Sequence, residues 1–351
     1  MRLVLRIVAL ALLVPVAVVA LLGLWGASWS PSGWFALGCV ALVGVALLFK
    51  DPKPRRGFAV IAGVLFAILI VVRVLGAGEG MIAMRTLPSG DSARWLARLV
   101  DEQDLALAGA RALALRGRMS ENERATLVPA MHAAYVDMRR DDVFAPTPVL
   151  DTFLRRQTPA AFDALVIEPR AEPKPNVPMK FGVLFLHGYA GSFTLECWLV
   201  ARAAREIGAL TVCPATDFSG RWRGQAAERT LQSTLDYLHR RNIHRVFLAG
   251  LSSGAIGASA LVGHFASSFE GLILLSGAPA EGESGGLPTL VVHGSQDAMT
   301  PVASARAFAE RHKATYKELP GGHFVMLTQR RDTREAIVNW LMRQTGYKTR
   351  P

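Results

Sequence analysis

The sequence predicts an α/β protein whose mostly parallel sheet has helices on both faces, preceded by a helical segment and about three transmembrane helices. Two observations lead to this fold class. In the C-terminal half, short apolar runs typical of buried strands alternate with stretches of helical periodicity. At the other end, residues 7–49 contain no charged side chain, whereas one bilayer crossing needs about 20 apolar residues. We therefore expect an anchor at 1–76, a helical linker or lid-like segment at 77–161 and a globular domain at 162–351.

The anchor is divided into expected spans at 3–26, 34–49 and 58–76. Basic residues lie at positions 2 and 6 and crowd the 50–57 loop, while the loop after the first span has none. The positive-inside rule then places the N-terminus in the cytoplasm and everything after the third span outside it. Two alternatives remain open: a re-entrant hairpin for the short second run, and a cleaved signal peptide for the first.

Charge and composition exclude some classes of function. Residues 1–76 hold seven Lys or Arg and one Asp, a net +6, and the remaining 32 basic and 27 acidic residues give +5 of the total of +11. More than half of the excess positive charge thus lies in the anchor, where it indicates membrane topology. The high net charge is therefore no sign of nucleic-acid binding, and we expect no nucleic-acid partner. His187 and His293 each precede a glycine at a strand end without zinc-ligand spacing, so no metal and no cofactor are expected.

Residues 77–161 have mostly helical patterns. One helix is expected to start at Asp91-Ser92, a second at the capping box from Ser120 to Glu123, and a third at Thr147-Pro148. Pro129 should kink or split the second. The segment is either a stalk packed on the next domain or a lid over its site.

The globular domain shows an alternation of strand and helix. Strands are expected at 162–169, 181–186, 209–213, 246–249, 272–277, 288–294 and 314–319, and helices at 194–207, 225–240, 255–267, 301–313 and 332–344. Only one strand precedes the 181–186 strand in this pattern, so the first strands of a full eight-stranded sheet are expected to be missing.

A G-x-S-x-G motif from Gly250 to Gly254 lies between the 246–249 strand and the 255–267 helix. In that position it predicts a sharp turn that raises the Ser252 hydroxyl above the sheet, with glycines that let strand and helix approach. A second match at 282–286 lies in a loop with no helix after it, which indicates a chance occurrence.

Two residues that a nucleophilic serine needs follow in order. A hydroxyl requires an imidazole to accept its proton and a carboxylate to orient that imidazole. Asp297 follows the 288–294 strand, and His323 follows the last strand after two glycines. Asp297 has an alternative interpretation, as a cap of the helix that begins near Thr300-Pro301.

With the His187-Gly188-Tyr189 loop after the 181–186 strand, these residues resemble the α/β-hydrolase superfamily over residues 162–345. The resemblance implies Ser252, Asp297 and His323 as the catalytic triad and Gly250 and Gly254 as parts of the nucleophile elbow. It also implies His187 and Gly188 as the oxyanion loop, with the N–H groups of Ser253 and Tyr189 as oxyanion donors.

The resemblance implies a serine hydrolase of carboxylic esters, anchored in the lipid bilayer, that forms an acyl-enzyme from a small-molecule or lipid-like ester. A serine peptidase or an acyltransferase of the same fold remains an alternative, as does a non-catalytic membrane-tethered binding domain. Cys197 and Cys213 lie toward one edge of the expected sheet, as a disulfide or as buried thiols.

Overall fold

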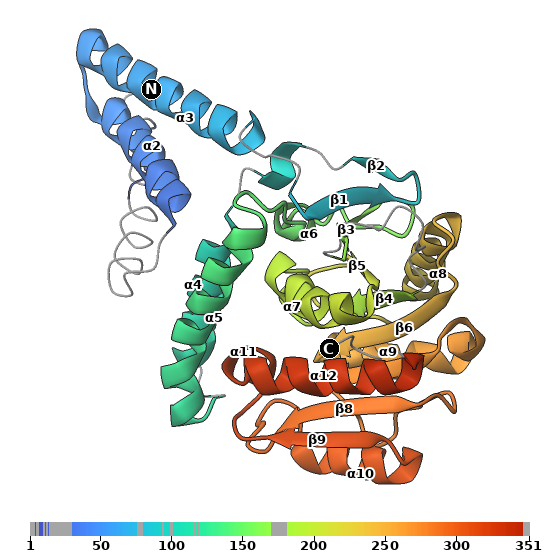
Figure 1. Cartoon of the computed structure of the whole chain (residues 1–351). Helices are drawn as coiled ribbons and strands as arrows, with labels where there is room; N and C mark the ends of the chain where they lie inside the picture. The colour runs from blue at the N-terminus through green and yellow to red at the C-terminus, as the bar shows by residue number, and fades with distance from the viewer. Residues whose placement is uncertain are drawn as a thin grey trace.

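A nine-stranded sheet forms the centre of the molecule, in the order β2-β1-β3-β5-β4-β6-β7-β8-β9 (Figure 1). The computed structural model describes residues 30–75, 80–92, 95–98, 101–115, 117, 119–169 and 181–346, with six positions between 4 and 13. The strands are β1 (Ile82–Leu87), β2 (Asp91–Ser92), β3 (Phe162–Ile167), β4 (Phe181–Leu186), β5 (Leu210–Pro214), β6 (Arg245–Leu251), β7 (Gly271–Leu275), β8 (Thr289–Gly294) and β9 (Thr315–Leu319).

The strand order and directions are those of the α/β-hydrolase fold, which confirms the predicted mostly parallel sheet. β1 and β3 pair antiparallel, as do β3 and β5, whereas every pair from β5 to β9 is parallel. All residues of β4 and β7 are buried, as expected for parallel strands covered on both faces. Their apolar runs could therefore be recognised directly in the sequence.

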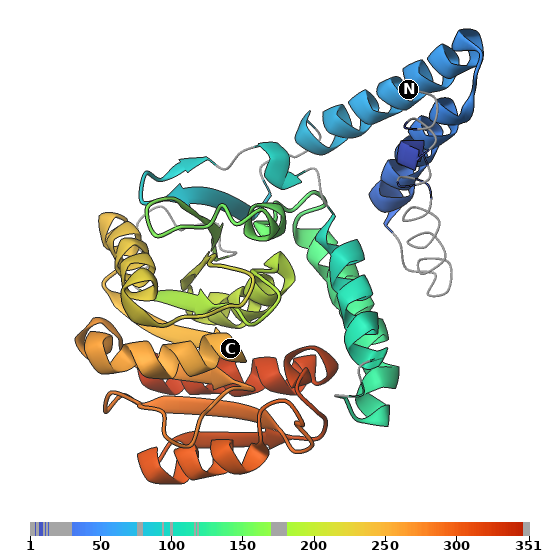
Figure 2. The same cartoon turned by 180° about the vertical axis from the view of Figure 1, so that it is seen from behind.

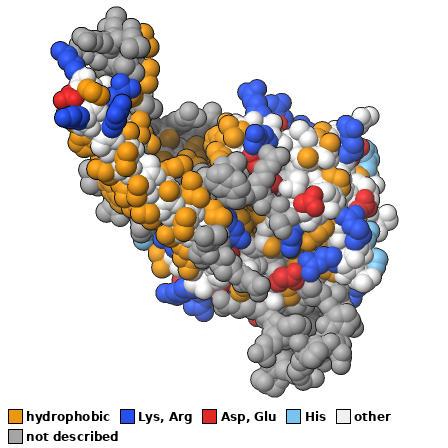
Figure 3. All heavy atoms as spheres, turned by 90° about the horizontal axis from the view of Figure 1, so that it is seen from above, with side chains coloured by type: hydrophobic (Ala, Val, Ile, Leu, Met, Phe, Trp, Pro, Cys, Tyr) orange, Lys and Arg blue, Asp and Glu red, His pale blue; other side chains and the backbone are white. Residues whose placement is uncertain are grey.

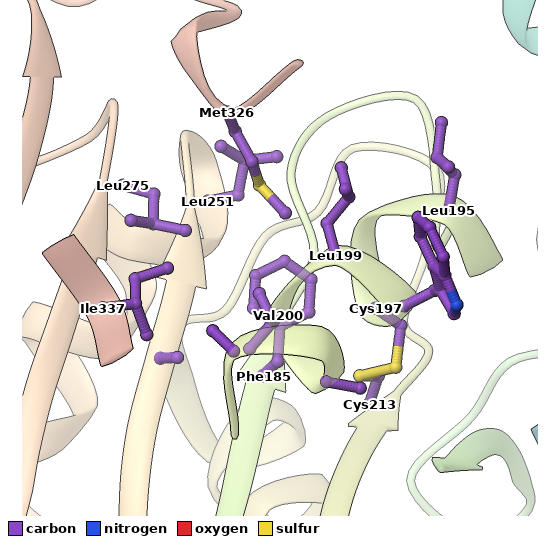
Figure 4. Close-up of a cluster of buried hydrophobic side chains, with 14 of the residues drawn as sticks. Phe185, Leu195, Cys197, Leu199, Val200, Cys213, Leu251, Leu275, Met326 and Ile337 are labelled. Carbon is purple, nitrogen blue, oxygen red and sulfur yellow. A yellow bond between two sulfur atoms is a disulfide. The ribbon is translucent and has the colours of Figure 1, made fainter. Parts of the chain in front are cut away.

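Helices cover both faces of the sheet (Figures 1 and 2). On one face lie α7 (Thr194–Ala204), η2 (Arg205–Ile207), α11 (Val325–Thr328) and α12 (Arg330–Thr345). On the other lie α8 (Gly224–Arg240), α9 (Ser253–Phe265), η3 (Ala266–Ser268) and α10 (Val302–His312). Each face has its own buried apolar cluster, and Figure 4 shows part of the one beneath α7 and α12.

A disulfide joins Cys197 of α7 to Cys213 of β5 (Figure 4), with the two Cα atoms 6.0 Å apart. Of the two alternatives left open by the sequence, the structure therefore has the bonded form. The disulfide ties the helix that follows the His187-Gly188 loop to the sheet.

The segment before β3 differs from the prediction. It contains η1 (Trp95–Arg98), α4 (Glu102–Leu115), α5 (Glu121–Asp141) and α6 (Val149–Phe153), but it also supplies β1 and β2. The first strands of the sheet are thus present, and the expectation that they are missing is wrong. Asp91 and Ser92 form β2 and do not begin a helix.

Of the two effects predicted for Pro129, the split does not occur, because α5 continues through it over 21 residues. The expected boundary at residue 162 falls inside the sheet, since β1 pairs with β3 along its whole length. The pairing explains β1: Ile82, Met84 and Leu87 are buried against the core, although the short run has no strong strand signal of its own.

At the N-terminal end, α2 (Pro31–Leu48) and α3 (Pro52–Leu75) form a hairpin. Among the described residues, one helical stretch, Pro52–Val74, is long and apolar enough to cross a membrane, and Ser32–Leu48 is a shorter apolar helix. The first expected span, 3–26, lies almost entirely outside the described residues. Figure 3 shows hydrophobic side chains along the hairpin and basic ones at its tip.

The hairpin is attached to the body by polar contacts. Arg73 of α3 is buried, and it donates hydrogen bonds to the Arg98 carbonyl and to the Ser32 hydroxyl, the latter at 2.8 Å. Asp104 of α4 accepts from the backbone N–H and the hydroxyl of Ser30, both at 2.8 Å. The C-terminal end of α3 thus adjoins the body.

Candidate active site

Ser252 lies at the turn between β6 and α9, where its φ of 54° and ψ of −119° are strained for a residue with a side chain. Gly250 and Gly254 explain how the turn closes. A Cβ at Gly250 would collide with the backbone of Gly254, and one at Gly254 would collide with the carbonyls of Leu186 and His187. Both glycines are therefore required by close backbone contacts at this turn.

The structure brings Ser252, His323 and Asp297 together in one chain of hydrogen bonds. His323 Nε2 lies 2.8 Å from Ser252 Oγ, and His323 Nδ1 lies 2.8 Å from Asp297 Oδ2. His323 and Asp297 are buried. A proton on Nδ1, donated to the carboxylate, leaves Nε2 free to accept the hydroxyl proton of Ser252.

Asp297 makes the contacts expected from both interpretations considered for it. Its Oδ1 accepts hydrogen bonds from the N–H groups of Met299 and Thr300, at 2.8 and 2.9 Å, as a turn-capping aspartate does. Its Oδ2 accepts from His323 and from the Thr300 hydroxyl at 2.7 Å. Burial would raise the pKa of Asp297, but the hydrogen bond and charge of His323, with the donors of Thr300, hold it below the usual value.

His187 organises the loop after β4. Its Nε2 accepts from the Thr216 N–H at 3.1 Å, so the proton lies on Nδ1, which donates to the Gly188 carbonyl at 2.8 Å. Burial lowers its pKa to about 4, which keeps the ring neutral near neutral pH. The Trp222 indole N–H donates to the His187 carbonyl at 3.0 Å. The contacts of His187 are thus structural, because they join the loop after β4 to the loop after β5.

Gly188 lies directly beside Ser252, since a Cβ there would be 3.4 Å from Ser252 Cβ. Tyr189 follows it with a side chain that is 62% exposed. Ser253 is the first residue of α9, and its buried hydroxyl has no hydrogen-bond partner within the described part of the chain. The residues expected to supply the oxyanion N–H groups are therefore near Ser252, and their role remains a prediction.

Glu196 supports the same loop from the first turn of α7. Its carboxyl accepts a hydrogen bond from the Gly188 backbone. Burial, with the nearby charge of Glu102, raises its pKa to about 8, so the group is mostly protonated at neutral pH. A carboxylic acid that becomes charged only in mild alkali thus contacts the backbone beside Ser252.

An apolar surface adjoins this loop. The Phe218 ring lies 5.0 Å from the Tyr189 ring and 5.1 Å from that of Phe153, between ring centroids. Phe153 and Leu154, at the end of α6, are each more than half exposed. The Phe218 carbonyl accepts from Ala190 N–H at 2.9 Å. The four side chains Phe153, Leu154, Tyr189 and Phe218, called the aromatic rim below, reach the surface next to the site.

The sequence did not indicate three contributors to this site. The Thr300 hydroxyl contacts Asp297 Oδ2 and lies 3.3 Å from His323 Nδ1. In the sequence, only its position three residues after Asp297 points to this contact. Glu123 accepts from the Phe324 N–H at 2.8 Å, across 201 residues, and Glu196 has no local sign. The second G-x-S-x-G serine, Ser284, bonds His312 at 3.1 Å.

No family model and no curated protein matches the sequence. Similar solved structures include Est1E from Butyrivibrio proteoclasticus, 19% identical with a TM-score of 0.44, covering 53% of this chain and 96% of that one. An α/β serine hydrolase without a lid from Xanthomonas campestris is 20% identical with a TM-score of 0.44, over 55% and 92%. A Pyrococcus furiosus esterase is 16% identical with a TM-score of 0.42, over 52% and 87%. With identities and TM-scores this low, the matches allow no conclusion about the activity of this chain.

Proposed function

We propose that this protein is a serine hydrolase that cleaves carboxylic esters through an acyl-enzyme, with Ser252 as nucleophile, His323 as general base and acid, and Asp297 as the orienting carboxylate. The observation that carries the proposal is the unbroken hydrogen-bond chain Ser252–His323–Asp297, which starts at a strained strand–helix turn. A binding domain has no need of such a strained serine in contact with an imidazole.

The reaction follows from these contacts. Ser252 Oγ attacks the ester carbonyl while His323 Nε2 takes its proton, and the imidazolium is stabilised by Asp297. The backbone N–H groups of Ser253 and Tyr189 are the proposed donors to the tetrahedral oxyanion. Collapse of this intermediate releases the alcohol, which takes the proton from His323. A water molecule, deprotonated by the same imidazole, then attacks the acyl-enzyme. The bond to Ser252 Oγ breaks, Oγ takes the proton back from His323, and the acid is released.

The aromatic rim supports an ester with an apolar portion as substrate, either a small molecule or a lipid. Exposed rings gathered beside a reactive group offer apolar contact area that short polar substrates do not use. No contact in the described residues favours a peptide or an acceptor alcohol over water.

The proposed location is the outer face of a membrane, with residues 1–76 as an anchor. The exposed apolar side chains of α3 and the basic tip of the hairpin support it. The disulfide between Cys197 and Cys213 also supports an oxidising compartment outside the cytoplasm. In this arrangement the catalytic domain remains beside the bilayer.

A fluorophosphonate probe tests the proposal, because it reacts with serines activated by a histidine. The wild-type chain in detergent should be labelled and should hydrolyse nitrophenyl esters, whereas Ser252→Ala should lose labelling and on the order of 10⁶-fold in kcat. Labelling that persists in this variant, at Ser253 for example, would refute Ser252 as nucleophile. A wild type that neither labels nor turns over would leave the binding-domain alternative.

The substrate class is tested by varying the acyl chain on one leaving group. Phe153→Ala should lower kcat/KM for a decanoate ester about tenfold and leave the acetate ester unchanged, since apolar contacts discriminate by factors of about 10–200. Leu105→Ala, which truncates an exposed side chain of α4, is the control. Equal losses on both esters would mean that Phe153 has no part in binding the chain.

A further inference from the structure

Glu123, near the start of helix α5, places its carboxylate against the turn that carries His323. Oε1 accepts from the Phe324 N–H at 2.8 Å, and a Cβ at Gly322 would collide with the same carboxylate. Glu123 is 4% exposed. The carboxylate thus contacts the backbone on both sides of His323, from a helix that precedes it by about 200 residues of chain.

This contact replaces a local one. The sequence from Ser120 to Glu123 is that of a capping box, in which the glutamate returns a hydrogen bond to its own helix start. The Ser120 hydroxyl makes the expected capping contact, accepting a hydrogen bond from the Glu123 N–H at 3.2 Å. The Glu123 side chain, however, is directed to Phe324. The helix therefore has only the serine half of the capping box, and the glutamate half is used at the turn that carries His323.

The helix that carries Glu123 is held firmly to the body. Asp141 at its end accepts from the Trp198 indole at 2.8 Å and pairs with Arg205 at 3.0 Å, and Asp137 pairs with Arg330 at 2.9 Å. Figure 1 shows α5 beside α11, the short helix that begins after His323. A side chain on such a fixed element can hold a neighbouring loop in one geometry.

A second glutamate makes the equivalent contact on the other side of the site. Glu102 of α4 is buried and accepts from the N–H groups of Thr194 and Leu195, both at 2.8 Å, at the start of α7. It also accepts from the Thr147 hydroxyl at 2.7 Å. The α4–α5 pair therefore reaches both chain segments that flank the nucleophile, the one after the oxyanion loop and the one that bears the base.

We propose that Glu123 is a positioning residue for His323, so that helix α5 completes the active site instead of serving as a stalk. Its carboxylate fixes the backbone of the turn, and its negative charge acts on the imidazolium formed in the reaction. The groups that act on it electrostatically are His323 and Asp297. Burial raises the pKa of Glu123, while the Phe324 N–H and His323 counter this increase and Asp297 adds to it.

Two substitutions separate the hydrogen bond from the charge. Glu123→Gln keeps a carbonyl oxygen for the Phe324 N–H and removes the charge, whereas Glu123→Ala removes both. Glu121→Gln changes the charge of an exposed residue in the same helical turn and is the matched control. All are measured as the full chain in detergent, with a soluble nitrophenyl ester.

We expect Glu123→Ala to lower kcat about 10- to 100-fold with KM within about twofold of wild type, the pattern of a lost transition-state geometry. Glu123→Gln should keep its plateau kcat within about fivefold of wild type. The acid limb of its kcat/KM profile should move to lower pH, because a base with one fewer neighbouring carboxylate is protonated less readily. Glu121→Gln should match the wild type in both measurements.

The inference rests on the proposed function, and hydrogen exchange separates the two. In Glu123→Ala, backbone amides of residues 322–329 should exchange faster than in Glu121→Gln, whether or not the protein is an enzyme. Unchanged exchange overturns the positioning role, and so does a Glu123→Gln pH profile superimposable on that of Glu121→Gln. An inactive wild type with faster exchange in Glu123→Ala would refute the hydrolase and keep the contact. If Glu123→Ala does not fold, Glu123→Gln decides through its pH profile.

Discussion

Asp297→Asn removes a charge while it preserves shape, and the contacts of Asp297 allow its effect to be worked out. The amide oxygen can keep the hydrogen bonds from the N–H groups of Met299 and Thr300. The amide nitrogen, placed toward His323, is a donor and cannot accept from Nδ1–H. The imidazole must then carry its proton on Nε2, which faces Ser252, and it can no longer act as a base.

The expected loss in kcat is on the order of 10⁴-fold, the cost of the wrong histidine tautomer. Stability should change by only about 1 kcal/mol, because the capping bonds remain. Asp297→Ala differs, since it leaves the N–H groups of Met299 and Thr300 without their acceptor, whereas the Thr300 hydroxyl keeps the Ser276 carbonyl as an acceptor at 2.9 Å. At about 1 kcal/mol for each N–H, this variant should lose about 2 kcal/mol as well as its activity.

The assay pairs steady-state hydrolysis of nitrophenyl acetate with urea unfolding followed by circular dichroism. Activity and stability should separate in Asp297→Asn and fall together in Asp297→Ala. An Asp297→Asn protein with kcat within about tenfold of wild type would refute the reasoning, because the carboxylate would then not determine the tautomer of His323.

Three further predictions follow from other contacts. The pKa of Glu196 is raised to about 8 in the folded protein, from about 4.3 in the unfolded chain, so between these pH values the folded state binds one proton more. The wild type should therefore lose stability relative to Glu196→Gln as the pH rises from 5 to 8, which urea titrations at several pH values will measure. Gly254→Ala should abolish esterase activity and lower the melting temperature, since its Cβ meets two carbonyls. Alkaline phosphatase should be active when fused after Gly80 and inactive when fused after Arg56, and the reverse pattern would place the catalytic domain in the cytoplasm.

The parts of the fold that could be predicted are those whose signals are local. β4 and β7 are continuous apolar runs because both faces of the sheet are covered. Ser252, Asp297 and His323 each follow a strand within a few residues. Since the carboxyl ends of parallel strands share one edge of a sheet, their grouping could be expected from strand positions alone.

The parts that could not be predicted depend on distant partners. β1 contains Arg85 and has only six residues, and it is a strand because β3 offers it a matching edge. Glu123 lies in a sequence with a sufficient local explanation, the capping box, so nothing there indicates a partner at Phe324. The continuous helix through Pro129 likewise depends on packing, since α5 buries Leu127, Met131 and Tyr135 along one face.

The register between β1 and β3 shows where the helical segment joins the sheet. Leu87, the last residue of β1, is the partner of Phe162, the first residue of β3, as in a hairpin closed by a tight turn. Apart from the two residues of β2, which pair with β1 at the edge of the sheet, the chain between them lies outside the sheet, so it can vary in length without altering the order of the other strands. Its side chains nevertheless form part of the core under α7, where Leu107 and Tyr135 are buried. A shortened chain that joins Leu87 to Phe162 by a two-residue turn would keep the sheet apart from β2, lose the carboxylate beside His323 and uncover one side of α7 to solvent.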